Sequence, residues 1–131
     1  MTNLIVTSTT AVIMAIWMLA QTISVIKMRR SERIVHGDAN NKTVMKRIRG
    51  HANNVEQAPL FLILLGLVEY QQMASCTVLA IVAAIFVIGR LSHGYYFLDI
   101  GAKHTFRQYG MLATMIAQIA IILCLIIGLL F

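Results

Sequence analysis

The chain has 131 residues, of which 59% are hydrophobic and only 12% are charged, and its mean hydropathy is +0.78. Soluble domains carry about 25% charged residues, so this composition excludes an ordinary soluble domain. A membrane-spanning helix needs roughly 20 apolar residues. The apolar runs therefore predict one all-α integral membrane domain over residues 1–131, built as a four-helix bundle.

The first apolar run predicts a helix over about residues 4–26, and a strongly basic connection follows it. Eight of the eleven lysines and arginines lie between the apolar part of this helix and that of the next: Lys27, Arg29, Arg30, Arg33, Lys42, Lys46, Arg47 and Arg49. The second connection has none, and the third contributes Lys103 and Arg107. By the positive-inside rule, the first and third connections face the cytoplasm and both termini lie on the periplasmic side. The net charge of +6 thus indicates the lipid bilayer as a partner, and not nucleic acid.

The second helix, over about residues 43–70, must include polar residues if it is to cross the bilayer. Its purely apolar part covers only about 17 Å, whereas the hydrocarbon core is about 30 Å thick. The helix therefore extends back through Glu56 and Asn53 toward Arg49, and these share one face at spacing i, i+4 and i+7. Pro59 is expected to kink the helix beside this face.

The third helix, over about residues 75–98, places Arg90 and His93 one turn apart in an otherwise apolar span. A charged group inside the bilayer costs at least about 2.5–3.5 kcal/mol on insertion scales. Arg49, Glu56 and Arg90 must therefore face one another, a partner subunit or a wet cavity. A cluster of Arg90 with Glu56 and Asn53 that only holds the helices together is one interpretation. Because basic groups outnumber Glu56, a cavity that binds an anion is the other.

The fourth helix is predicted over about residues 106–131, with Arg107 near its start. Thr114 and Gln118 share a face of this helix and are expected to hydrogen-bond to a neighbouring helix. Cys76 and Cys124 lie in apolar runs without partners at metal-ligand spacing. We therefore expect no metal site.

Two motifs resemble those of a known family. The stretch "RIRGHANNVEQAPLF" matches the signature R-x-H-x-N-x-x-E-x-x-P-x-F of the MAPEG family, the membrane-associated proteins of eicosanoid and glutathione metabolism. The stretch "GRLSHGYYF" resembles the third-helix motif of that family, with Arg90 and His93 in place. Six motif positions at fixed spacing make this a specific signal, and the similarity covers the whole chain, closest to small bacterial inner-membrane members.

The resemblance implies a homotrimer in a bacterial inner membrane, with glutathione bound as co-substrate between neighbouring subunits. The implied glutathione-binding residues are Arg29, Arg49, Asn53, Glu56, Arg90 and His93, and the implied catalytic residues are Arg107, Arg30 and His93. A guanidinium near a thiol favours the thiolate. The implied activity is a microsomal-type glutathione transferase, or a peroxidase, that acts on small lipophilic electrophiles.

Departures from the family pattern leave other interpretations open. Phe97 stands where several catalytic members have a tyrosine, and Gln108 stands where the prostaglandin synthases have a serine. A non-catalytic binding or scaffold protein of the same fold is therefore the main alternative. A small four-helix transporter is disfavoured because the arginines around Glu56 repel cations. A haem protein would use His51 and His93 as axial ligands.

Overall fold

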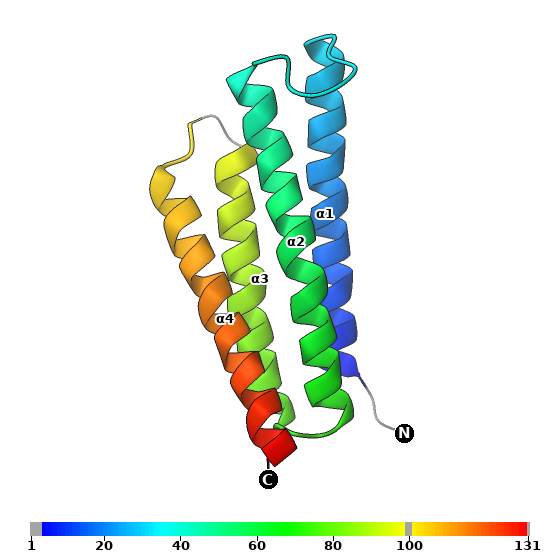
Figure 1. The fold of residues 1–131 in the computed structure, drawn as a ribbon, viewed down its shortest axis with the longest axis vertical. Coiled ribbons are helices and arrows are strands. Elements are labelled where there is room, and N and C mark those ends of the chain that lie inside the picture. The colour runs from blue at the N-terminus through cyan, green and yellow to red at the C-terminus, as the bar shows by residue number, and fades with distance from the viewer. Residues whose placement is uncertain (1–3, 99–100, 131) are drawn as a thin grey trace.

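The computed structural model describes residues 4–98 and 101–130 of the chain. Four α-helices run side by side along the long axis of the molecule (Figure 1). They are α1 (Ile5–Ser31), α2 (Lys42–Tyr70), α3 (Cys76–Leu98) and α4 (His104–Leu130). The predicted all-α, four-helix architecture is confirmed.

Helix α1 ends five residues later than predicted, because the basic residues after the apolar run continue the helix. Lysine and arginine in a last helical turn are favourable beside the partial negative charge of the helix C-terminus. The helix ends in a Schellman motif, in which the Ile34 N–H donates to the Arg29 carbonyl (2.9 Å) and the Arg33 N–H to the Arg30 carbonyl (3.3 Å). The predicted end of the helix was wrong because it was placed just before the first charged residue, Lys27.

Helix α2 starts at a side-chain cap, because the Asn41 side chain accepts hydrogen bonds from the backbone N–H groups of Thr43 (3.0 Å) and Val44 (3.2 Å). The helix continues through Pro59 to Tyr70 as one element. The predicted bounds of α2 and α3 differ from the observed ones by one residue, and α4 begins two residues earlier than predicted.

Three helices, α1, α3 and α4, are long and apolar enough to cross a membrane. Helix α2 is not among them, because Glu56 and the polar residues around it lower its hydropathy. It packs against the other three helices and runs beside α1 and α3 over their length (Figure 1). The polar residues of α2 therefore lie in a bundle whose other three helices are apolar enough to span a membrane.

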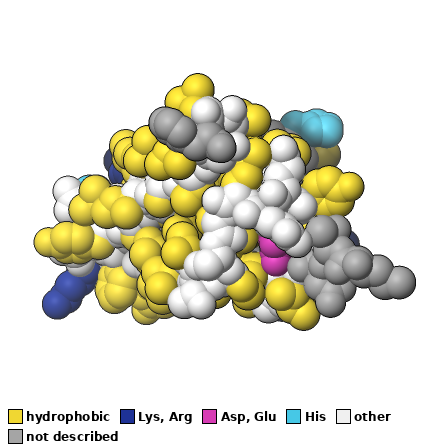
Figure 2. Space-filling model, turned by 90° about the horizontal axis from the view of Figure 1, so that it is seen from below, with side chains coloured by type: hydrophobic (Ala, Val, Ile, Leu, Met, Phe, Trp, Pro, Cys, Tyr) yellow, Lys and Arg dark blue, Asp and Glu magenta, His cyan; other side chains and the backbone are white. Residues whose placement is uncertain are grey.

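The two ends of the bundle differ in charge. The basic end holds the loop between α1 and α2 and the connection from α3 to α4, and the terminal end holds both chain termini and the connection from α2 to α3 (Figure 1). Figure 2 shows mostly hydrophobic side chains on the terminal end, with a small acidic area among them. From residue 57 to residue 89 the sequence contains a single charged side chain, Glu69.

Glu69 closes the terminal end by capping a helix other than its own. Its carboxylate accepts hydrogen bonds from the backbone N–H groups of Val6 (2.8 Å) and Thr7 (2.7 Å) and from the Thr7 hydroxyl (2.6 Å). Leu4, at the N-cap position of α1, makes no side-chain cap. Because free N–H groups at a helix start need acceptors, α1 depends on α2 for its N-terminal cap.

Candidate functional site

Arg90 is the largest fully buried side chain of the described residues, with 0% of its surface exposed. Its Nε donates to Asn54 Oδ1 (3.2 Å) and its Nη2 donates to Asn53 Oδ1 (2.9 Å). Its Nη1 has no hydrogen-bond partner among the described residues. Both partners are neutral amides, so the positive charge of the guanidinium is solvated but not neutralised.

A small pocket of about 190 Å³ lies in front of this group, where α2, α3 and α4 meet near the basic end. We call it the arginine pocket. Its lining residues are Arg49, Asn53, His93, Phe97 and Arg107. The same Asn53 that lines the pocket also accepts the hydrogen bond from Arg90. Two guanidinium groups therefore line this pocket, a third donates a hydrogen bond to its lining residue Asn53, and no carboxylate is among the described residues of the lining.

The arginine pocket adjoins a larger cavity of about 470 Å³ along α4. The two share Asn53, His93 and Arg107. The larger cavity, which we call the methionine groove, is also lined by His104, Gln108, Met111, Leu112 and Met115. A polar, cationic site thus continues into a mostly apolar one, and Arg107 lies where they meet.

Close helix packing fixes this arrangement. At Gly110 of α4, a Cβ atom would lie 2.5 Å from the backbone nitrogen of His93, which leaves no room for any side chain. At Gly50 of α2, a Cβ atom would lie 2.4 Å from the Cβ of Phe97. These two glycines let α4 and α2 approach α3, so that Arg107 and Arg49 reach the same pocket as His93.

The structure brings together Arg49, Asn53, Arg90, His93 and Arg107 of the predicted site residues. Arg29 lines a neighbouring cavity of about 310 Å³ with Asp38 and Arg49. Arg30 lies farther away, in a cavity with Arg33. Glu56 is exposed on the outer face of α2, and it makes no ion pair within the described residues. The interpretation of a cluster of Arg90 with Glu56 and Asn53 is met only in part by a single chain. Arg90 does donate to Asn53, but Asn54 takes the place expected for Glu56.

Asn54 is the site residue that the sequence prediction missed. It is 1% exposed and holds Nε of Arg90. Helical spacing contained the signal, because Asn54, Ala58 and Phe61 follow one another at i, i+4 and i+7 and all three are buried. A polar residue in register with a buried apolar face needs a buried partner.

His51 and His93, the two histidines that a haem would need as ligands, make contacts in different parts of the bundle. His51 Nε2 lies 3.0 Å from the Thr22 hydroxyl of α1, whereas His93 lines the arginine pocket. The first is a hydrogen-bonded link between α1 and α2. The structure gives no support to the haem interpretation.

The described residues that line the arginine pocket include no hydroxyl group. Phe97 lines it, and its ring lies 5.7 Å from the guanidinium carbon of Arg107. The neighbouring Tyr96 packs against other groups, with Lys46 Nζ 4.0 Å from its ring centre and the His104 ring at 5.6 Å. Tyr96 therefore does not supply to this pocket the hydroxyl group that is missing at Phe97.

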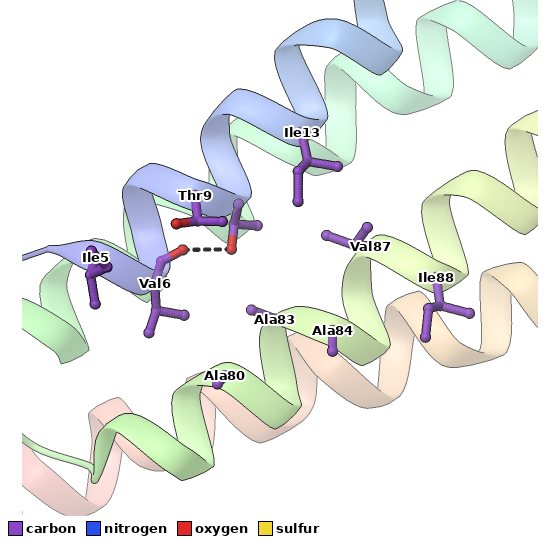
Figure 3. Close-up of a pocket in the computed structure, with 10 residues that line it drawn as sticks. Ile5, Val6, Thr9, Ile13, Ala80, Ala83, Ala84, Val87 and Ile88 are labelled. Carbon is purple, nitrogen blue, oxygen red and sulfur yellow. Dashed lines mark hydrogen bonds between the residues drawn. The ribbon is translucent and has the colours of Figure 1, made fainter.

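A second, apolar cavity of about 420 Å³ lies between α1 and α3 toward the terminal end (Figure 3). Its lining is aliphatic apart from Thr9 and Thr10, and the Thr10 hydroxyl already donates to the Val6 carbonyl (2.7 Å). This cavity offers no charged group, so it is not a site for a polar ligand.

A model of the MAPEG family matches residues 7–127. The chain is also 28% identical over 113 residues to the inner membrane protein YecN of Escherichia coli strain K12, across 86% of this chain and 84% of that protein. YecN of Escherichia coli O6:H1 strain CFT073 has the same identity and coverage. No solved structure matches the chain. Because the family match covers nearly all of it, this four-helix membrane protein belongs to the MAPEG family.

Proposed function

We propose that this protein binds glutathione in the arginine pocket and transfers it to lipophilic electrophiles. The observation that carries the proposal is Arg90, a fully buried cation with a free Nη1, behind a pocket lined by Arg49 and Arg107. Glutathione has two carboxylates, and guanidinium groups bind carboxylates through paired, charge-assisted hydrogen bonds. An acidic tripeptide supplies the negative charge that this pocket lacks.

The two adjoining cavities suit the two reactants. The glutathione thiol would lie near Arg107, which lines both cavities, and the apolar electrophile would lie in the methionine groove beside Met111 and Met115. A nearby guanidinium stabilises a thiolate over a thiol, and the thiolate is the nucleophile. Neither Cys76 nor Cys124 lines either cavity, because the ligand brings the reacting sulfur.

Glu56 gives a reason to place the complete site between subunits. An exposed carboxylate midway along a membrane-crossing helix is costly in contact with lipid. A second copy of the chain would cover this face of α2, and Glu56 would then reach the amino group of a glutathione bound in the arginine pocket of that neighbouring subunit. We propose a homotrimer with shared sites on this ground, in a bacterial inner membrane with the basic end in the cytoplasm.

A non-catalytic binding protein of the same fold is the second candidate, and Phe97 favours it. Among the described residues, no tyrosine or serine hydroxyl lines the arginine pocket or the methionine groove. Activation of the thiol would then rest on Arg107. A coupled assay with a generic aryl halide separates the two candidates, since a scaffold binds glutathione without turnover.

Arg107→Ala tests the transferase proposal. We expect kcat to fall by about tenfold to a hundredfold, as for the loss of one positioned charge, while glutathione affinity changes by less than about threefold, because Arg49 and Arg90 remain. Lys103→Ala removes a cation from the same end without touching either cavity and is the control. Unchanged conjugation in Arg107→Ala would show that its catalytic role is wrong.

Mixed oligomers test the shared site. Glu56→Ala and Arg107→Ala chains are each expected to have strongly reduced conjugation activity alone. If a site uses Glu56 of one chain and Arg107 of another, co-expression of the two variants restores part of the activity, because some sites receive both intact residues. Conjugation that stays at the level of the single variants would contradict sharing between subunits.

A further inference from the structure

A separate cavity lies where α1 ends, away from the arginine pocket. We call it the helix-end pocket, and its volume is about 440 Å³. Its lining residues are Ile26, Arg29, Arg30, Arg33, Ile34 and Val35. Each of these is an arginine or an aliphatic residue, so three guanidinium groups and three aliphatic side chains line the pocket, with no carboxylate among the described residues of the lining.

The backbone holds Arg33 in an unfavourable conformation at this pocket. Arg33 has a φ of 55°, at the position of the Schellman motif where glycine is usual. A residue with a side chain is less stable than glycine in this left-handed region, because its Cβ comes close to the carbonyl oxygen of the backbone. Such strain is typically kept at functional positions. Here it places a third guanidinium beside those of Arg29 and Arg30.

The nearby carboxylates are engaged elsewhere. Glu32 accepts a hydrogen bond from the Asn41 side chain (3.1 Å). Asp38 accepts one from the Asn40 N–H (3.0 Å) and lines the cavity on the other side of Arg29. Arg29 Nε is buried and has no partner within the described residues. Among the described residues, neither carboxylate therefore lines the helix-end pocket to balance its positive charge.

The depth of the pocket matches the membrane surface. It begins at Ile26, the last residue of the uncharged part of α1. Val35 is 76% exposed and Ile26 is 45% exposed, so the rim presents aliphatic surface beside the guanidinium groups. A free anion makes no use of that apolar surface, whereas a lipid presents a phosphate next to its acyl chains.

We propose that the helix-end pocket binds the phosphate diester of an anionic phospholipid. Arginine forks match phosphate oxygens in geometry and charge, and basic pockets at the ends of membrane helices attract anionic headgroups. Ile26, Ile34 and Val35 contact the first methylene groups of the chains. Arg29 also lines the cavity that contains Arg49, whereas Arg30 and Arg33 line the helix-end pocket and not that cavity. The proposed site therefore gives Arg30 and Arg33 a role at the membrane surface.

Native mass spectrometry of the full chain in detergent tests this site, with dioleoyl phosphatidylglycerol as probe and dioleoyl phosphatidylcholine for comparison. Arg33→Gly removes one guanidinium and relieves the backbone, since glycine suits a positive φ, so the variant should fold. We expect its affinity for phosphatidylglycerol to fall by about tenfold. Lys27→Ala removes a neighbouring cation that does not line the pocket and should weaken binding by less than about twofold.

Equal losses in Arg33→Gly and Lys27→Ala would show a diffuse basic surface and overturn the proposal. Equal binding of phosphatidylcholine and phosphatidylglycerol would overturn it as well. Inorganic phosphate is the third probe. If it displaces phosphatidylglycerol at equal concentration, the site takes a free anion and the lipid assignment is wrong. Glutathione titration of Arg33→Gly should match the unmodified protein, which keeps this test separate from the proposed function.

Discussion

The two ends of this bundle each hold a charged side chain between helices, and they treat it differently. At the terminal end, the Glu69 carboxylate accepts three hydrogen bonds from Val6 and Thr7. Toward the basic end, Arg90 makes two hydrogen bonds to amides and keeps one nitrogen unpaired although it is fully buried. A charge that its own chain satisfies is structural, whereas a buried charge left incomplete indicates a ligand or a second subunit.

The cavities repeat this difference. The cavity toward the terminal end is aliphatic and its Thr10 hydroxyl is already bonded (Figure 3). The cavities toward the basic end have arginine in their linings. Cavity size alone would not distinguish them, since the largest volumes are similar, at about 420 Å³ and 470 Å³. The cavities are distinguished instead by the charge of their lining residues and by unpaired hydrogen-bonding groups.

The same substitution at two glycines should have opposite effects in the two halves. Gly110→Ala places a Cβ 2.5 Å from the His93 backbone nitrogen, and we expect it to lower the free energy of unfolding by about 2–3 kcal/mol. Gly66→Ala meets only the Thr7 methyl group at 3.5 Å and should raise it by up to about 1 kcal/mol through helix propensity. Reversible denaturation in mixed micelles measures both. If Gly110→Ala did not lower the free energy of unfolding, α3 and α4 would not be in tight contact at Gly110.

Removing the Glu69 carboxylate should affect stability and leave the site intact. Glu69→Ala leaves the first N–H groups of α1 without their cap, so we expect a loss of about 1–2 kcal/mol. Glutathione binding should be unchanged, because Glu69 lies at the terminal end. Denaturation in mixed micelles and ligand titration are both required. Weaker glutathione binding would show that the two ends are coupled.

The smallest effect is expected at an amide pair between α2 and α4. Gln118 Nε2 donates to Gln57 Oε1 (2.8 Å), and Gln118→Leu should lower the free energy of unfolding by about 0.6 kcal/mol, the mean for such bonds in membranes. The same denaturation measurement applies. A loss as large as that from Glu69→Ala would mean that neutral amides hold the bundle as strongly as the Glu69 cap does.

The sequence predicted the four helices and most of the arginine pocket, because the apolar runs, the spacing of Arg49 with Asn53 and the spacing of Arg90 with His93 are local patterns. The expected hydrogen bond from Gln118 to a neighbouring helix is confirmed, with Gln57 of α2 as its partner, whereas Thr114 instead donates to the Gly110 carbonyl of its own helix (2.8 Å). A hydroxyl has this local choice and a longer amide does not.

Other features depend on which distant helix lies opposite, and no local pattern contains that information. Glu69 reaches α1 across more than 60 positions of sequence. Arg30 was grouped with the catalytic residues by resemblance, but the Schellman end of α1 puts it beside Arg33. The position of Glu56 in a complete site depends on a second chain, which stays a prediction.

Isothermal titration of the detergent-purified protein with glutathione tests the central claim most directly. We predict saturable binding with Kd below about 1 mM, weakened at least about tenfold in Arg90→Ala and unchanged in Glu69→Ala, with circular dichroism showing that all three proteins remain helical. Folded protein that gives no heat with glutathione, or an Arg90→Ala variant that binds as tightly as the unmodified chain, would contradict the account.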